Sequence, residues 1–219
     1  MRSSIYGKAN AVGKYAANLI FNIQREYAAE GGSNSRSRAR LARLRRDLDG
    51  MSPSWMLIGD ELFTNWPQEL DAPSDNSPEF NRQVNAVRTT LGLYAVHQQS
   101  KKQGVAQRYQ DNPSQRMTFG RACKMIAPDP ERAKGILRRL RVAENAPDFN
   151  GIVRSVRALI TLMRGTDIQV DYGSLAHDLY LVQFPAYRGE VFQRWGRDYY
   201  SKSASAQENQ QLSFFRGHK

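Results

Sequence analysis

The sequence predicts an all-α protein: an elongated bundle of about eight helices, which can be divided into two packed sub-bundles. Three observations predict this class. Apolar residues recur along most of the chain at the three- and four-residue spacing of one helix face. No run of alternating β-branched residues is bounded by turn pairs, as a strand would require. Asp129 and Asp171 each stand where a helix start needs a capping side chain.

Three helices are predicted in the first half of the chain. Residues 15–27 carry an apolar side chain at every fourth position, and a Gly-Gly pair ends that helix. Residues 34–48 have a narrow leucine stripe with arginine at most other positions, so the arginines must face water or phosphate. A loop rich in proline follows at residues 65–79. Residues 80–98 then carry apolar side chains on two faces, which predicts a central helix.

A polar loop at residues 101–113 separates this part from five further helices. Thr118 is expected to cap the first of them, which is short. Asp129 as N-cap, with Pro130 at the first helical position, begins the next helix. That helix is expected to extend to about residue 142.

The third of these helices covers residues 152–164, with a broad apolar stripe toward the core. Three arginines lie opposite that stripe: Arg154, Arg157 and Arg164. Asp171 caps the fourth helix, which Pro185 is expected to terminate. The last helix is predicted over residues 188–200 and directs an apolar stripe that includes Trp195 inward.

These elements divide the chain into four segments. Residues 1–35 form an N-terminal helix and its extension, and residues 36–110 form an N-terminal helical part that contains the acidic loop 65–79. Residues 111–200 form a C-terminal helical bundle. Residues 201–219 are rich in Ser, Gln and Asn and are expected to be a flexible tail.

Charge is the strongest signal in the composition. The chain has 32 Lys and Arg against 21 Asp and Glu, a net charge of +11 and a pI near 10.0. A surplus of this size indicates a polyanionic partner, most simply nucleic acid. Residues 36–46 hold six arginines and no acid, whereas residues 47–80 hold eight acids and no Lys or Arg. We interpret most of this acidic segment as a solvated loop; the alternatives are that it docks a basic neighbour or keeps stray nucleic acid off one side of the protein.

Arginine on helices is the feature that points to binding. The guanidinium group binds phosphate through a planar fork of donors on any base sequence. No helix resembles a base reader, which would carry Asn, Gln, Ser or Thr among its arginines. The helices at 129–142 and 152–164 are expected to pack together so that their arginines flank a common groove. The candidate nucleic-acid-binding residues are Arg38, Arg43, Arg45, Arg46, Lys101, Lys102, Arg116, Arg121, Lys124, Arg138, Arg139, Arg141, Arg154 and Arg157.

Catalysis finds little support. Cys123 lies on the apolar side of its short helix and is expected to be an inert, buried thiol. For His97, a structural hydrogen bond is favoured over a functional role. His177 and Asp178 are neighbours on a helix, where side chains diverge by about 100° and do not easily share a metal. The sequence therefore predicts no catalytic residue, no metal site and no cofactor.

A single cysteine excludes an internal disulfide framework and agrees with a reducing, cytoplasmic setting. The mean hydropathy is −0.64, and no apolar run approaches the ~18 residues that a membrane helix needs. The start of the chain lacks the pattern of a signal peptide. A cytoplasmic protein with no membrane partner is therefore expected.

Several strings of the sequence resemble one family when they are taken together. They are SRARLARLRR at 37–46, LYAVHQQS at 93–100, TFGRACKMIAPDPERAKGILRRLRVA at 118–143, VRALITLMRG at 156–165, VDYGSLAHDLY at 170–180 and RWGRDYY at 194–200. In this order, over residues 36–200, they resemble the CasB family, the small subunit of the type I-E CRISPR surveillance complex, Cascade. One departure is Val182-Gln183, where the family often places tryptophan.

The resemblance implies an all-helical protein without catalytic activity that takes part in antiviral defense. Two copies would lie along the inner face of a multi-subunit complex that contains CRISPR RNA, with its backbone and large subunits. They would help to hold the target DNA strand and the displaced strand of the R-loop. Guide pairing would supply the sequence specificity, and an R-loop close to energetic balance is tipped by modest protein contacts.

Two other classes of function compete with this one. A free-standing helical DNA-binding regulator would need a base-reading helix. A nuclease or RNA-processing enzyme, the weaker alternative, would need a converging cluster of acids or histidines. The sequence shows neither feature.

Overall fold

The structure is a computed structural model that describes residues 2–29, 35–48, 55–72, 77–108, 112, 115–127 and 129–201. Over these ranges the chain forms nine α-helices and no strand, and the extended pairing there is one parallel bridge between Ala106 and Val170. The predicted all-α class is therefore confirmed. The helices are α1 (Arg2–Ala29), α2 (Ser35–Leu48), α3 (Trp55–Phe63), α4 (Pro78–Gln98), α5 (Phe119–Met125), α6 (Pro130–Glu144), α7 (Phe149–Arg164), α8 (Tyr172–Leu181) and α9 (Pro185–Tyr200).

Three helices of the second half begin at the capping side chains that the sequence predicts. Thr118, Asp129 and Asp171 each accept a hydrogen bond from the backbone N–H three residues further on. Ser77 does the same for α4 and Asp148 for α7. Each bond satisfies one of the amide groups that a helix leaves unpaired in its first turn.

The structure differs from the sequence prediction in three elements. α1 begins at Arg2 rather than near residue 15, because the buried stripe continues backward through small residues such as Ala9. α9 begins at Pro185, since proline lacks an amide hydrogen and fits the first turn of a helix. α3 lies in the acidic segment, where a loop is predicted; Ile58 and Leu62, one turn apart, are both buried and hold it in place.

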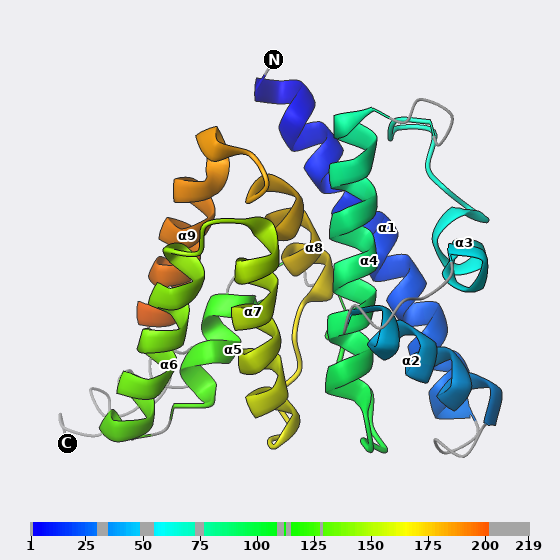
Figure 1. Cartoon of the computed structure of the whole chain (residues 1–219). Coiled ribbons are helices and arrows are strands. Elements are labelled where there is room, and N and C mark those ends of the chain that lie inside the picture. The colour runs from blue at the N-terminus through cyan, green and yellow to red at the C-terminus, as the bar shows by residue number, and fades with distance from the viewer. Residues whose placement is uncertain are drawn as a thin grey trace, which may run out of the picture.

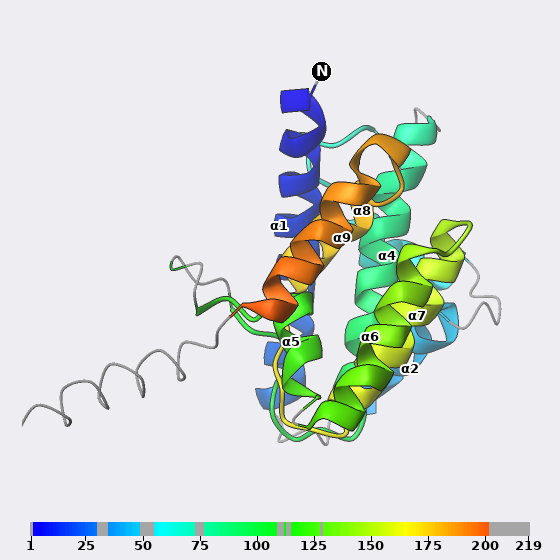
Figure 2. The ribbon, with the colours of Figure 1, turned by 90° about the vertical axis from the view of Figure 1, so that its left-hand side faces the viewer.

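The helices form two groups that pack against each other. α1 to α4 lie on one side of Figure 1 and α5 to α9 on the other, and α8 lies between them against α1 and α4. α7 also packs against α4, and α6 packs against α7. In Figure 2, α6, α7 and α2 are on the right and α1 is on the left. One continuous cluster of buried apolar residues runs through both groups.

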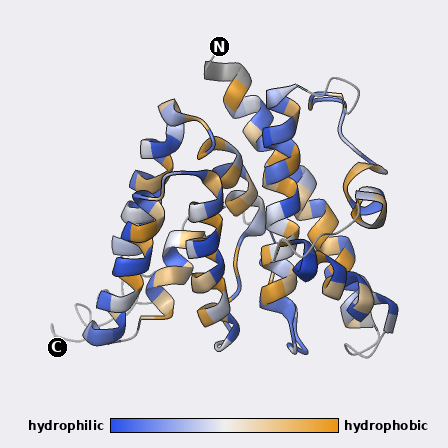
Figure 3. Ribbon diagram, viewed as in Figure 1, coloured by the Kyte–Doolittle hydropathy of each residue, from blue (hydrophilic) through white to orange (hydrophobic). Residues whose placement is uncertain are grey.

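Helix α4 is the central helix, as the sequence predicts. Most of its side chains from Phe80 to Gln98 are buried, including the polar residues Gln83, Thr90 and His97. Figure 3 shows hydrophobic and hydrophilic residues alternating along α4, α6 and α7, as expected for helices that each bury part of their surface. None of the helices in the described ranges is both long and apolar enough to cross a bilayer.

Trp195 anchors α9 to two other helices. Its side chain is only 2% exposed, and its ring centroid lies 4.7 Å from that of Phe119 on α5. Its indole nitrogen donates a 2.6 Å hydrogen bond to Asp178 on α8. A Cβ atom at Gly120 would lie 2.3 Å from the carbonyl oxygen of Trp195, so α5 and α9 touch through their backbones. The inward phase predicted for Trp195 is correct.

Trp195→Ala is expected to lower the free energy of unfolding by ~3–5 kcal/mol, because it leaves a cavity among three helices and removes a partner of Asp178. Tyr200→Ala is the matched control, since this aromatic residue of the same helix is 70% exposed; its effect should stay under ~0.5 kcal/mol. Chemical denaturation measures both variants. Equal stabilities would contradict the buried position of Trp195.

Candidate nucleic-acid interface

The groove expected between the two arginine-bearing helices is present as a surface cleft of about 740 Å³ between α6 and α7. We call it the α6–α7 cleft. Its other lining residues are neutral, and none of the lining residues is acidic. The cleft therefore presents positive charge with no carboxylate in its lining. Its arginines are Arg138, Arg139, Arg141 and Arg154.

A second cleft, of about 470 Å³, lies between α2, the end of α4 and α7, and we call it the α2–α7 cleft. Arg164 donates a 2.7 Å hydrogen bond to Gln99 Oε1 within it, and Arg45 reaches the carbonyl oxygen of Ala95 at 3.5 Å. Its other lining residues are neutral too. Its arginines are Arg45, Arg46, Arg157 and Arg164.

The two clefts share α7 and form one surface. Arg154 lines the first cleft and Arg157 lines the second, and residues three apart are neighbours on a helix. The four helices α6, α7, α4 and α2 follow one another across the molecule in Figure 1. We call the arginines of both clefts the arginine band. Arg164 belongs to it although it is not among the candidate residues; its place opposite the apolar stripe of α7 is the sequence signal that points to it.

Acidic residues divide the arginines of α2 into two sets. Glu61 on α3 forms ion pairs with Arg40 and, at 3.7 Å, with Arg43, and Arg40 also pairs with Glu26 at 2.8 Å. Arg43 thus lies in a pocket of mixed charge and not in the arginine band. Arg38 is exposed and lines neither cleft.

The acidic segment is predicted to be a solvated loop. This is wrong for the carboxylates that pair with basic residues of neighbouring helices. Asp47 is buried and accepts a 2.5 Å hydrogen bond from Arg88 on α4. Asp71 pairs with Lys8 of α1 at 2.8 Å. A carboxylate removed from water needs such a partner, so the segment docks onto basic residues of its own chain. Asp49, Asp75 and the rest of residues 49–54 and 73–76 lie outside the described residues.

The remaining candidate residues line neither cleft of the arginine band. Lys101 donates 2.9 Å hydrogen bonds to the carbonyl oxygen of Thr166 and to Asp167. Arg121 donates to the carbonyl oxygen of Arg116 at 2.8 Å. The last two are Lys124, which donates to the carbonyl oxygen of Ser201 at 2.6 Å, and Lys102, which is exposed beside Lys101.

The described residues contain no group of three or more His, Cys, Asp or Glu that is placed to hold a metal ion. Cys123 is buried, and burial raises the pKa of its thiol. The prediction that His177 and Asp178 diverge is wrong: His177 Nδ1 lies 3.1 Å from Asp178 Oδ1, because side-chain rotation closes the angle between neighbours. Asp178 also accepts hydrogen bonds from Arg194 and Trp195, so this carboxylate joins α8 to α9.

His97 lies in the core at the end of α4, where its Nδ1 is 3.0 Å from the hydroxyl oxygen of Tyr172. Desolvation by burial lowers its pKa to about 4. The neutral imidazole is therefore the form that the folded protein holds at neutral pH.

The pKa of His97 predicts how stability depends on pH. Histidine in the unfolded chain has a pKa of ~6.5. Between this pH and the pKa of folded His97, the histidine is protonated in the unfolded state and neutral in the folded state. The free energy of unfolding should fall as the pH drops from about 6.5 to about 4, by up to ~3 kcal/mol. Denaturation at a series of pH values tests this with His97→Gln as comparison, in which the fall should shrink. Identical pH profiles would contradict the assignment.

The fold and the surface together define an all-helical protein with a broad arginine surface and no metal-binding cluster in the described ranges. The family profile described as CRISPR-associated protein Cse2 matches residues 40–200, which is most of the chain. The chain belongs to this family, also called CasB, whose members are subunits of the CRISPR Cascade complex. They are structural subunits and generally non-catalytic.

Solved structures agree with this membership. The crystal structure of CasB from Thermobifida fusca has 29% sequence identity and a TM-score of 0.69, over 87% of this chain and 98% of that one. The crystal structure of M. ruber CasB, at 20% identity and a TM-score of 0.59, covers 90% of this chain and 98% of that one and shows the same fold. No curated protein sequence matches the chain.

Proposed function

We propose that this chain is the non-catalytic, nucleic-acid-binding small subunit of a type I-E Cascade complex in antiviral defense. In this proposal the arginine band holds the phosphate backbones of the target strand and the displaced strand of the R-loop. One observation carries the proposal: two adjoining clefts share α7 and are lined by arginines without a single acidic lining residue.

The chemistry of the band favours phosphate over bases. A guanidinium group presents a planar fork of donors that matches phosphate oxygens in any sequence context. Arg40 pairs with Glu61 and Glu26, whereas the four arginines of the α6–α7 cleft share a lining that contains no Asp or Glu. Sequence choice is then left to guide pairing, and because strand exchange is nearly balanced, a few phosphate contacts decide whether the R-loop persists.

Family membership supports the choice of partners. We expect the chain to act in the cytoplasm within the complex that contains CRISPR RNA, next to its backbone and large subunits and to a second copy of itself. The proposal involves no cofactor, no metal and no membrane. Seven of the candidate residues lie in the arginine band, and we propose that they bind phosphate: Arg45, Arg46, Arg138, Arg139, Arg141, Arg154 and Arg157.

The first test removes two arginines from the α6–α7 cleft. Arg139→Ala with Arg141→Ala should leave the fold intact, with a change in stability under about 0.5 kcal/mol at the exposed Arg141 and of about 1 kcal/mol at the half-buried Arg139, which donates a hydrogen bond to the Gly135 carbonyl oxygen. Complexes rebuilt with this variant should retain the target strand several-fold less well, because phosphate contacts are lost from a nearly balanced exchange. Target-strand retention is measured with a melting curve alongside.

A matched control removes the same charge from the same helix. Arg132 and Lys134 are exposed on α6, pair with Asp129 and Glu131, and do not line the cleft. Arg132→Ala with Lys134→Ala should therefore leave retention unchanged. If Arg139→Ala with Arg141→Ala and also Arg45→Ala with Arg46→Ala retained the strand as well as the parent, the proposed function would be wrong.

Salt dependence provides a second test. Each phosphate contact contributes ~0.7 to the slope of log K against log salt concentration on a single strand and ~0.9 on duplex DNA. The affinity of the isolated protein for single-stranded DNA should fall steeply with salt. Substituting Arg139 and Arg141 should reduce the slope by about 1.4 if both bind phosphate. Binding that is insensitive to salt, or a single preferred sequence, would count against the arginine band as the binding surface.

A further inference from the structure

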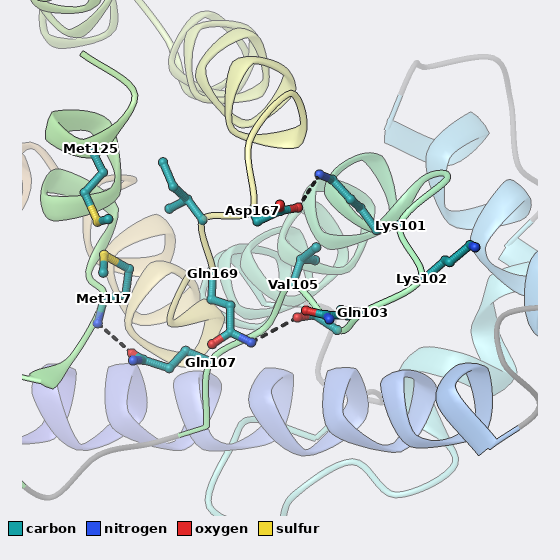
Figure 4. Close-up of a pocket in the computed structure, with 11 residues that line it drawn as sticks. Lys101, Lys102, Gln103, Val105, Gln107, Met117, Met125, Asp167 and Gln169 are labelled. Atoms are coloured by element: carbon teal, nitrogen blue, oxygen red, sulfur yellow. Dashed lines mark hydrogen bonds and ion pairs between the residues drawn. The ribbon is translucent and has the colours of Figure 1, made fainter. Parts of the chain in front are cut away.

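A separate cavity of about 470 Å³ lies at the turns that follow α4 and α7 (Figure 4). It adjoins the α2–α7 cleft. Gln99 and Arg164 line the cleft, and Lys101 and Asp167, a few residues further along the same two turns, line the cavity. The proposed function makes no use of this cavity, although Lys101 and Lys102 are candidate binding residues.

The lining of the cavity combines apolar side chains, amides, two lysines and one carboxylate, that of Asp167, which pairs with Lys101 at 2.9 Å. Its apolar part consists of Val105, Ile168 and the thioethers of Met117 and Met125, and Met125 is 51% exposed although it is apolar. In Figure 4 the two methionines lie at one end of the cavity and the two lysines at the other. The amide side chains between these ends are Gln103, Gln107 and Gln169.

Two glutamines, the buried Gln98 and the half-buried Gln24, hold the loop that forms the cavity. Gln98 donates to the carbonyl oxygens of Lys101 and Gln103 at 3.2 and 3.0 Å and accepts from the amide of Val105 at 3.1 Å. Gln24 of α1 accepts from the amide of Ala106 at 2.9 Å and donates to its carbonyl oxygen at 3.2 Å. The cavity is therefore formed before any ligand arrives, which lowers the entropy cost of binding.

The opposite wall is fixed in the same way. The backbone of Val170 donates to the carbonyl oxygen of Val105 at 3.0 Å and accepts from the amide of Gln107 at 2.9 Å. Gln169 donates one amide hydrogen to the carbonyl oxygen of Gly104 at 3.0 Å. An amide side chain has two donors and a carbonyl oxygen, so Gln169 keeps a donor and an acceptor for a ligand.

These side chains can contact the three parts of one nucleotide that a protein binds: the ring of the base, the edge of the base and the phosphate. Thioether sulfur packs well against aromatic rings, and the cavity volume lies in the range of small-molecule sites. Proteins bind unpaired bases by stacking against the ring and by hydrogen bonds to its edges. Glutamine amides can form such hydrogen bonds. Lysine binds phosphate as a compact positive charge. Lys102 is exposed and lies at the end of the cavity opposite the methionines (Figure 4).

We propose that this cavity binds one unpaired nucleobase of a single-stranded nucleic acid, with the adjoining phosphates on Lys102 and the arginine band. The proposal rests on the proposed function, because the strand reaches the cavity from the α2–α7 cleft. Glutamine amides both donate and accept hydrogen bonds, so the site tolerates different bases. DNA and RNA share this chemistry.

The experiment separates base binding from phosphate binding. The isolated protein is titrated at low salt into two single-stranded DNA oligomers of equal length and charge, one with thymine at every position and one without bases. The oligomer with bases should bind about tenfold more tightly, because contacts of a base with the thioethers and hydrogen bonds to its edge add to the phosphate contacts. Gln169→Ala with Met125→Ala should lose most of this preference. The matched control is Met56→Ala, since this methionine is 84% exposed on α3 and does not line the cavity.

Each outcome is decisive. Equal affinity of the parent protein for both oligomers, or full preference in the cavity variant, overturns the nucleobase site while phosphate binding stands. Binding of neither oligomer overturns the proposed function as well. Arg139→Ala with Arg141→Ala should lower the affinity for both oligomers by the same factor. The same pair of oligomers made as RNA shows which nucleic acid has the larger base preference, and Gln103→Ala replaces the double variant if that variant fails to fold.

Discussion

The close packing of α8 against α1 and α4 is the contact on which the rest of the structure depends. A Cβ at Gly13 of α1 would lie 2.7 Å from the carbonyl oxygen of Gly173 on α8, so these backbones touch where neither residue has a side chain. On α4, Tyr94 packs edge-on against Tyr172 of α8, whose hydroxyl group also meets His97. This packing joins the two groups of helices and places α7 beside α4.

The arginine band is a consequence of that packing. Arg45 and Arg46 come from the first group of helices, and the arginines of α6 and α7 come from the second. Glu61 of the acidic segment pairs with Arg40 and Arg43 of α2, which line a pocket of mixed charge outside the arginine band. The charge of the chain is thus distributed unevenly: several carboxylates pair with basic residues within the fold, and the outer face of α7 carries the exposed Arg154 and the half-buried Arg157 and Arg164.

Helix α7 connects the two proposed binding surfaces. Its outer face contributes Arg154, Arg157 and Arg164 to the band, and the turn that follows it contributes Asp167 and Gln169 to the cavity. In the proposed arrangement a strand that follows this helix meets guanidinium groups along its phosphates and amide and thioether groups at one base. In such a division the guanidinium groups supply affinity through charge, and the cavity holds one base of the strand at a defined place on the protein.

The sequence by itself determined the features that depend on neighbouring residues: the caps at Asp129 and Asp171, the inward face of α9, and the arginine-bearing sides of α6 and α7. It did not determine α3, because a short helix in an acidic segment is held by contacts to distant helices. Only the tertiary structure separated Arg43 from Arg45 and Arg46 and placed Arg164, which the sequence puts on the outer face of α7, in a cleft beside α2. The charge that an arginine presents to a ligand depends on which carboxylates other helices bring near it, and this is a property of the packing rather than of local sequence.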